Sequence, residues 1–436
     1  MLALCCAGLL VPALSAATEY SATPSISFQL QHDSNLLLTS QPHQSVTGLT
    51  IAPHIDLSAA QANWNITGSV DLRGHRYSGQ SSLNGNDQAY NLSSLYQTQR
   101  NTFQLNGGYA SEAVTASSIF SPDIGLVSAQ TQRITRSVNP SWTWQMTERT
   151  HLEINYQSGL ISYEYSPNSS LIDYTTRDGT ATLSYQWSPQ DQLTVQLDRS
   201  YFTVPQEMPS QLGQPAYTSF FGALYPNPRV LSNTSTTDSL VMGWSHSFSQ
   251  TLSTSLSAGA RQTNSDSTVQ TCTASTTPTF NFITGQFVGT CSQTANTSYS
   301  YKSNGYLYNA QISKRFELTG LNLALGRQVT PSAIGTQVQM DSVDLGINHK
   351  LSERLNADLT LAGYRVRSIG NAVSTLTDEN YELASTDLSW RWTRRLTVQT
   401  GYRYITLKFL NNNIRAHNNT VYLRIEYAWR RFSISR

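Results

Sequence analysis

The chain has 436 residues, a formal net charge of +1, 13% charged residues and 39% hydrophobic residues. No composition shift marks a linker, so one large domain is expected rather than two or three soluble ones. After the first residues no hydrophobic run reaches the ~18 residues of a membrane helix, which excludes a helical membrane protein. The 23 Tyr and 8 Trp, with abundant Ser, Thr, Asn and Gln, favour a strand-rich protein with aromatic rings at two membrane interfaces.

Residues 1–17 are expected to be a cleaved signal peptide. Leu2 to Ala17 form an apolar run that ends in Ser-Ala-Ala, small residues that suit signal peptidase. The mature chain should therefore begin near Thr18. The basic segment usual at such an N-terminus is missing, because no Lys or Arg precedes Arg73.

A short polar turn recurs along the chain. Trp187-Ser-Pro-Gln-Asp-Gln-Leu193, Leu351-Ser-Glu-Arg-Leu355 and Trp392-Thr-Arg-Arg-Leu396 each open with Ser or Thr and separate two arms of alternating apolar and polar residues. Alternation on both arms is typical of hairpins with one apolar face. In chain order, the pattern predicts strands at 25–33, 48–59, 61–77, 87–99, 101–113, 129–145, 150–163, 174–187, 191–203, 234–248, 251–265, 296–316, 318–330, 336–350, 353–367, 380–393, 395–409 and 416–429.

The number of predicted strands is even, and their connections alternate between short turns and longer loops. This is the arrangement of outer-membrane barrels, which have short periplasmic turns and long external loops. The predicted fold class is therefore all-β: a transmembrane antiparallel up-and-down β-barrel of about 18 strands (16 to 18), formed by residues 18–436 as a single domain. The alternatives are a secreted β-rich sandwich, a solenoid or an adhesin.

The two longest external loops are predicted at 204–233 and 266–295. The first carries four aromatic residues that could stack on sugar rings as loop glycan contacts or could only pack the loops together: Tyr217, Phe220, Phe221 and Tyr225. The second carries Cys272 and Cys291. Export to an oxidising compartment favours a disulfide between them, and two free thiols are the alternative.

The C-terminal third is the basic part of the chain, with 18 of the 28 Lys and Arg residues after position 300. Strand parity points seven charged residues of this part inward as predicted channel-lining residues: Asp344, Asp358, Asp387, Arg391, Arg403, Arg424 and Glu426. A barrel of about eighteen strands is wide enough for an aqueous lumen. Opposed acidic and basic rows would then discriminate among solutes, unless they form a salt-bridge ladder that only stiffens the wall.

The last predicted strand places five apolar or aromatic residues on one face, namely Val421, Leu423, Ile425, Tyr427 and Trp429. Such a terminal strand is what outer-membrane barrels present to the barrel assembly machinery, which is therefore an expected partner together with outer-membrane lipid. Barrel chains usually stop at the aromatic residue. Here a tail from Arg430 to Arg436 follows, so either Phe432 takes that role or the tail extends past the barrel.

No motif supports an enzyme. The eight His are scattered without metal-ligand spacing, and the chain contains no His-Glu-x-x-His, no Gly-x-Ser-x-Gly and no phosphate-binding loop. We therefore expect no catalytic residue, no metal, no cofactor and no nucleic-acid partner.

The segment Gly326-Arg-Gln-Val-Thr-Pro-Ser-Ala-Ile-Gly-Thr-Gln-Val-Gln-Met-Asp-Ser342, continuing to Leu351-Ser-Glu-Arg-Leu355, resembles a family of uncharacterised barrels associated with exosortase (PEP-CTERM) and exopolysaccharide loci. The likeness covers the C-terminal 130 residues best, and the N-terminal half resembles the family only in style. It implies an outer-membrane barrel of a Gram-negative bacterium, with polysaccharide or export-system proteins as possible partners and no established activity to carry over.

Three functions remain open from the sequence. The first is a channel linked to exopolysaccharide or surface-protein export. The second is a structural or assembly barrel with a closed lumen, and the third is a general diffusion porin.

Overall fold

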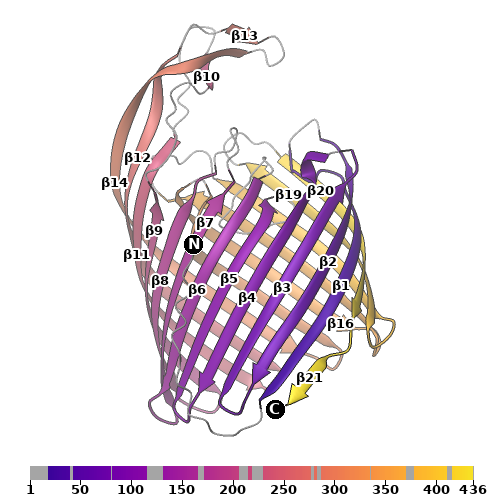
Figure 1. The fold of residues 1–436 in the computed structure, drawn as a ribbon. Helices are drawn as coiled ribbons and strands as arrows, with labels where there is room; N and C mark the ends of the chain where they lie inside the picture. The colour runs from indigo at the N-terminus through magenta and orange to yellow at the C-terminus, as the bar shows by residue number, and fades with distance from the viewer. Residues whose placement is uncertain are drawn as a thin grey trace.

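The chain folds into a closed antiparallel β-barrel, seen in a computed structural model that describes residues 18–39, 43–79, 81–114, 131–164, 171–205, 215–218, 229–275, 279–281, 286–333, 335–369, 378–409 and 415–435. Eighteen strands form the wall (Figure 1). Each strand pairs with its neighbour in the chain, and the pairing of β1 with β20 closes the ring. The predicted fold class is confirmed. Among the residues described, no helix is long and apolar enough to cross a membrane.

Each wall strand coincides with one of the eighteen predicted segments, although the two strands that flank the predicted loop 266–295 extend well into it. Their bounds are β1 (Glu19–Asp33), β2 (Val46–Ala60), β3 (Trp64–Tyr77), β4 (Gly85–Gln97), β5 (Asn101–Val114), β6 (Thr131–Gln145), β7 (Thr150–Tyr163), β8 (Tyr174–Gln186), β9 (Asp191–Val204), β11 (Arg229–Ser249), β12 (Leu252–Ser275), β14 (Gln286–Arg315), β15 (Thr319–Pro331), β16 (Gln337–Lys350), β17 (Leu355–Ser368), β18 (Glu379–Arg391), β19 (Leu396–Phe409) and β20 (Arg415–Ala428). The short strands β10 (Pro215–Thr218), β13 (Thr279–Asn281) and β21 (Phe432–Ser435) and a 3-10 turn at Ser81–Leu83 complete the elements.

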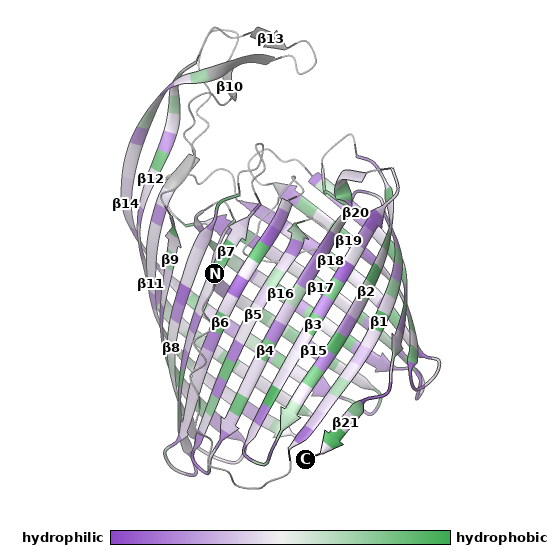
Figure 2. Ribbon diagram, viewed as in Figure 1, coloured by the Kyte–Doolittle hydropathy of each residue, from purple (hydrophilic) through white to green (hydrophobic). Residues whose placement is uncertain are grey.

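The outer face of the wall is apolar. On β20 the side chains of Val421, Leu423 and Ile425 are 55%, 45% and 41% exposed, while Thr420 on the other face is buried. Similar exposed apolar residues occur on almost every strand, and Figure 2 shows hydrophobic and hydrophilic positions alternating along the ribbons. Because a closed ring leaves no unpaired strand edge, this belt can face hydrocarbon on all sides.

The recurring polar turns are closed by their first hydroxyl group. The Oγ of Ser352 accepts hydrogen bonds from the backbone N–H groups of Arg354 and Leu355, at 3.3 and 3.1 Å. Thr393 binds the N–H groups two and three residues ahead in the same way. A Ser or Thr at this position satisfies donors that a tight turn would otherwise leave unpaired. The hydroxyl therefore explains why Ser or Thr opens these turns.

The stretch 266–295, predicted as a loop, is largely strand. β12 continues to Ser275 and β14 begins at Gln286, so the two strands extend the barrel wall into a long hairpin that rises above the rim (Figure 1). The residues concerned are rich in Thr and Ser, which suggested a loop, but Thr is β-branched and also favours strands. β10 and β13 pair with β14 near the tip.

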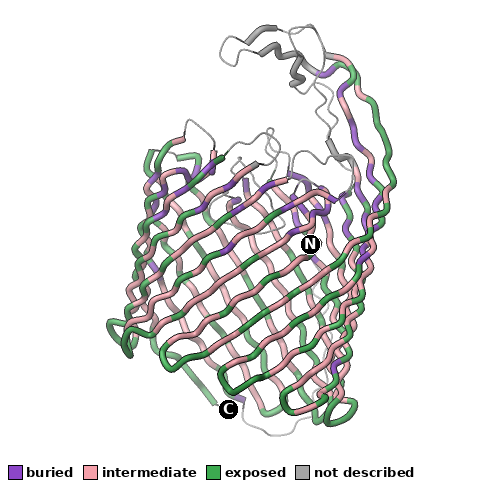
Figure 3. Tube along the Cα trace, turned by 180° about the vertical axis from the view of Figure 1, so that it is seen from behind, coloured by how far each residue is buried: buried purple, intermediate pink, exposed green. Residues whose placement is uncertain are grey.

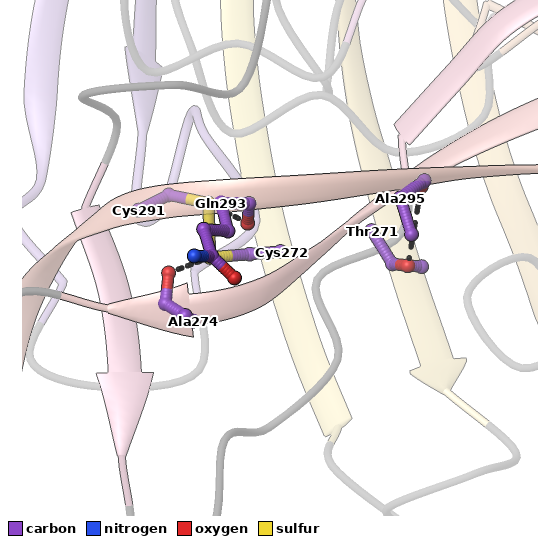
Figure 4. Close-up of a disulfide and its surroundings, with 6 residues drawn as sticks. All are labelled: Thr271, Cys272, Ala274, Cys291, Gln293 and Ala295. Carbon is purple, nitrogen blue, oxygen red and sulfur yellow. Dashed lines mark hydrogen bonds between the residues drawn. A yellow bond between two sulfur atoms is a disulfide. The ribbon is translucent and has the colours of Figure 1, made fainter.

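A disulfide joins the two arms of this hairpin. Cys272 on β12 and Cys291 on β14 are bonded, with their Cα atoms 5.7 Å apart (Figure 4). The register shifts on either side of Ala274, so the two strands are irregular at this point. The pairing is the one expected from the sequence, and it crosslinks the arms where the ladder is irregular.

The tail that follows β20 stays attached to the barrel. β21 pairs with the first residues of β1, from Glu19 to Ala22, and the N–H of Trp429 donates to the carbonyl oxygen of Pro24 at 3.0 Å. β1 is longer than β20 at the turn end, and β21 occupies the edge that would otherwise be open. The tail therefore extends past the last wall strand, and its described residues form an extra strand at the seam between β20 and β1.

Candidate functional site

The inner wall of the barrel surrounds a polar cavity of about 780 Å³. Its lining comes from the inner faces of β1 to β5, β19 and β20, together with two residues from rim segments. The charged or imidazole side chains among the lining residues are Asp33, His54, Asp71, Arg73, His75, Asp87, Glu112, Arg403, Arg424 and Glu426. The cavity is therefore polar and is lined by charges of both signs.

Carboxylates hold the two histidines of this wall. The Nδ1 of His54 lies 2.7 Å from an Asp71 oxygen, and its Nε2 lies 3.0 Å from an Asp56 oxygen. The Nε2 of His75 lies 2.7 Å from Asp87. Both rings are thereby fixed in orientation along the lumen. The Nδ1 of His75 also lies 2.9 Å from the hydroxyl oxygen of Thr50, so this ring bridges a hydroxyl group and a carboxylate.

The structure places all seven predicted channel-lining residues on the inner face of the wall, but only three of them line the same cavity. Arg403, Arg424 and Glu426 line the cavity, and Arg424 forms an ion pair with Glu426 at 3.1 Å. Asp358 instead lines a separate hollow near the turns, and Arg391 lies at the turn end, where it donates to the carbonyl oxygen of a neighbouring turn residue.

The remaining two residues are tied to tyrosines. Asp344 accepts a hydrogen bond from the hydroxyl of Tyr364 at 2.5 Å, and Asp387 accepts one from the hydroxyl of Tyr422. These partners hold the carboxylates close to the wall. The seven residues thus form a cavity group, a turn-end group and a pair of Tyr–Asp contacts rather than one continuous row.

The turn between β15 and β16 folds into the barrel and narrows its mouth. The side chain of Asn233 on β11 donates to the carbonyl oxygen of Gly335 at 2.9 Å, and the N–H of Ile172 donates to the carbonyl oxygen of Ala333 at 2.8 Å. Ala333 is fully buried in a cluster with Val114 at the end of β5. Because β5 lies far around the ring from β15, this tip reaches across the lumen.

The upper part of this hairpin lies within the lumen and is not part of the ring of wall strands. β14 pairs with β15 only from Tyr308 to Arg315, although both strands continue further toward the rim. Gln337 of β16 accepts hydrogen bonds from Ser235 and Thr237 of β11, at 2.8 and 3.2 Å. By parity Gln337 shares the outer face of β16 with the exposed Val343, while the two β11 residues face inward. The outer face of the hairpin therefore packs against the inner face of the wall.

A second segment, between β1 and β2, also folds inward. Asn35 closes it through two hydrogen bonds with the backbone of Thr39, at 2.8 and 3.1 Å. Leu38 adopts a positive φ of 48° and packs against Ile405 and Leu407, which are 1% exposed on the inner face of β19. Figure 3 shows that buried positions gather at the loop end of the barrel. The mouth is thus the best-packed part of the molecule.

No known protein family model matches the chain, and no curated protein matches it. Solved structures of similar shape include the closed form of the ferric-catecholate import receptor Fiu from E. coli K12, with 10% identity, a TM-score of 0.48 and coverage of 94% of this chain and 81% of that one. OpdO from Pseudomonas aeruginosa has 9% identity, a TM-score of 0.42 and coverage of 94% and 97%. At such low similarity these likenesses concern the barrel fold and carry no argument about function.

Only three of the ten charged or imidazole side chains that line the cavity were predicted from the sequence. The predicted inward charges all lie in the basic C-terminal third, whereas His54, Asp71, Arg73, His75 and Asp87 come from β2 to β4. The signal was present, because Asp71, Arg73 and His75 occupy alternate positions opposite the exposed Leu72. Closure of the ring brings these N-terminal strands beside β19 and β20.

The proposed glycan-contact residues cannot be placed as a group. Phe220, Phe221 and Tyr225 lie outside the described residues. Tyr217 belongs to β10, whose backbone pairs with β14, but the position of its side chain is not described. Within the described ranges, no three His, Cys, Asp or Glu side chains gather as metal ligands would.

Proposed function

We propose that this protein is a channel of a Gram-negative outer membrane that conducts small polar solutes or ions through the lumen of the barrel. The observation that carries the proposal is the contrast between the two faces of one wall: apolar side chains outside and a charged cavity inside. A barrel with a purely structural role would need the apolar outer face but not the charged cavity.

The positions of the charges suggest what the channel prefers. Arg403 and Arg424 face the same cavity as Asp71, Asp87 and Glu112, so positive and negative groups border a common aqueous space. A field between opposed charges orients water and favours solutes that carry charge or a strong dipole. The substrate class is therefore proposed as small ions and polar molecules.

A finer proposal is that the channel serves exopolysaccharide or surface-protein export. Its support is the sequence likeness of residues 326–342 and 351–355 to barrels associated with such loci. The first of these stretches contains the β15–β16 tip that narrows the mouth. If the likeness reflects a shared role, the shared residues are those that control passage.

A structural or assembly barrel with a closed lumen is the second candidate. The observation that favours it is the packing of the β15–β16 tip and the β1–β2 segment at the mouth, which buries Ala333 and Leu38 almost completely. A barrel that only anchors partners would gain stability from such packing and lose nothing.

Single-channel recording from the purified protein in planar bilayers separates the two candidates. The channel proposal predicts discrete conductance steps that scale with salt concentration and vanish when the protein is heat-denatured before addition. Silence from protein that is folded and inserted, as judged by its heat-dependent gel mobility, would favour the structural barrel.

A further inference from the structure

A row of basic side chains crosses the outer face of the barrel at its loop end. Cross-strand pairing places Arg327 of β15 opposite Asp341, Asp341 opposite Arg365, Arg365 opposite Asn380, Asn380 opposite Lys408, and Lys408 opposite Arg415. Neighbouring strands are about 4.8 Å apart, so this is a continuous row over six strands, β15 to β20. It contains four cations and one carboxylate.

Parity puts Arg365, Lys408 and Arg415 on the side that faces away from the lumen, whereas Arg327 and Asp341, where the β15–β16 hairpin begins to leave the wall, are mostly buried. Lys408 shares its face with the exposed Tyr404, and Arg415 shares its face with the exposed Val421. Arg365 likewise shares its face with the exposed Leu361. The cations therefore stand directly above the apolar belt, on the same surface that contacts lipid.

The carboxylate of the row, Asp341, already forms ion pairs with two arginines. Asp341 binds Arg327 through two contacts, one of them at 3.0 Å, and lies 3.8 Å from Arg367, which stands beside Arg365 on the same face. Among the described residues, Arg365, Lys408 and Arg415 form no ion pair with an acidic side chain. Arg327 and Arg367 are thus paired with Asp341, whereas Arg365, Lys408 and Arg415 are not.

We propose that this row, Arg365, Lys408 and Arg415 with Arg367, binds the phosphate groups of a phosphorylated glycolipid in the outer leaflet. The inference rests on the proposed outer-membrane location. Unpaired cations at the edge of a lipid-facing belt lie at headgroup depth, where an anionic headgroup supplies the missing counter-charge. Guanidinium groups bind phosphate with two parallel hydrogen bonds, which suits a headgroup that is held in place by its acyl chains on the belt below.

The position of the row suggests what the bound lipid would do. The proposed ligands lie on β17, β19 and β20, and β20 closes the ring with β1. A headgroup that bridges these strands would brace the wall beside the closing seam.

The test compares two triple variants in detergent solution. One variant carries Arg365→Ser, Lys408→Ser and Arg415→Ser, and the matched control carries Arg354→Ser, Arg394→Ser and Arg395→Ser at the opposite, turn end of the barrel. Binding of purified lipid A and of its dephosphorylated form is measured by native mass spectrometry. Gel mobility with and without heating verifies that both variants are folded.

Lipid A should bind the rim variant about 100-fold more weakly than the wild type, since each basic residue near a lipid surface contributes about 1 kcal/mol, or roughly fivefold. The control variant should bind like the wild type, and dephosphorylated lipid should not distinguish the three proteins. Equal lipid A binding by wild type and rim variant would overturn the proposal, as would undiminished binding of the dephosphorylated lipid. Because this assay reads lipid binding, a silent channel would leave its result unaffected.

Discussion

Arg403 and Arg424 are the cations that face the cavity from the C-terminal wall, and their surroundings differ. Arg424 pairs with Glu426 at 3.1 Å, whereas Arg403 forms no ion pair with an acidic side chain among the described residues. Arg391, on the same face, lies at the turn end and contacts a backbone carbonyl. Position along the strand, and not parity alone, decides which inward charge borders the cavity.

Replacing Arg403 and Arg424 by Ser should shift ion selectivity toward cations. A charge facing water interacts with a nearby ion by roughly 0.5 to 1 kcal/mol, so the cation-to-anion permeability ratio should rise about twofold to fivefold. Reversal potentials across a salt gradient in planar bilayers measure this ratio. Arg391→Ser is the control and should leave it unchanged; an equal effect of both changes would show that position along the strand does not matter.

For single residues, the sequence predicts which face of a strand a side chain occupies, but it does not predict which side chains of other strands it contacts. Alternation assigned Asp344 and Asp387 correctly to the inner face, but their contacts with the hydroxyls of Tyr364 and Tyr422 depend on side-chain reach across neighbouring strands. The cavity residues His54 and His75 became visible as part of the site only when the ring was closed, because they lie more than 300 residues from Arg403 in the chain.

At the scale of the element, the β15–β16 hairpin departs most from the expected barrel. Its period-2 pattern correctly predicts two strands, but alternation cannot tell whether a strand stays in the wall. The departure is visible only in contacts such as those of Gln337 with β11. The separation of β14 from β15 beyond Tyr308 gives the hairpin room to tuck inward.

Gly335 makes the tucked tip possible and provides a test of its role. It has a positive φ of 80°, and a Cβ there would lie 3.1 Å from Ile172 and 3.4 Å from Val204. Gly335→Val would add backbone strain of about 1 to 2 kcal/mol as well as this crowding, and should push the tip away from the opposite wall.

Larger or longer open events in single-channel recordings are the expected result for Gly335→Val. The control is Gly320→Ala, because Gly320 lies at the turn end with open space around it and no positive φ. Recordings from Gly335→Val that match those of the wild type in amplitude and open time would mean that the tip does not limit passage.

At the scale of the whole molecule, the barrel could be predicted because apolar and polar residues alternate regularly along its strands. Strands that alternate apolar and polar residues and pair into a closed ring follow from the need to leave no strand edge in hydrocarbon. The long hairpin was missed because Ser and Thr occur in both loops and strands, and the inward folding of the mouth was missed because it depends on contacts between distant segments. The periodic parts of the fold were predictable and the non-periodic parts were not.

The most direct test of the two-faced wall is cysteine labelling along β20 in proteoliposomes. Leu423→Cys, Arg424→Cys and Ile425→Cys are each treated with a membrane-impermeant thiol reagent, while the native Cys272 and Cys291 are protected by their disulfide. Arg424→Cys should react quickly and the other two should not, because only Arg424 faces water. Equal labelling of Leu423→Cys and Arg424→Cys would contradict a wall with lipid on one side and an aqueous lumen on the other.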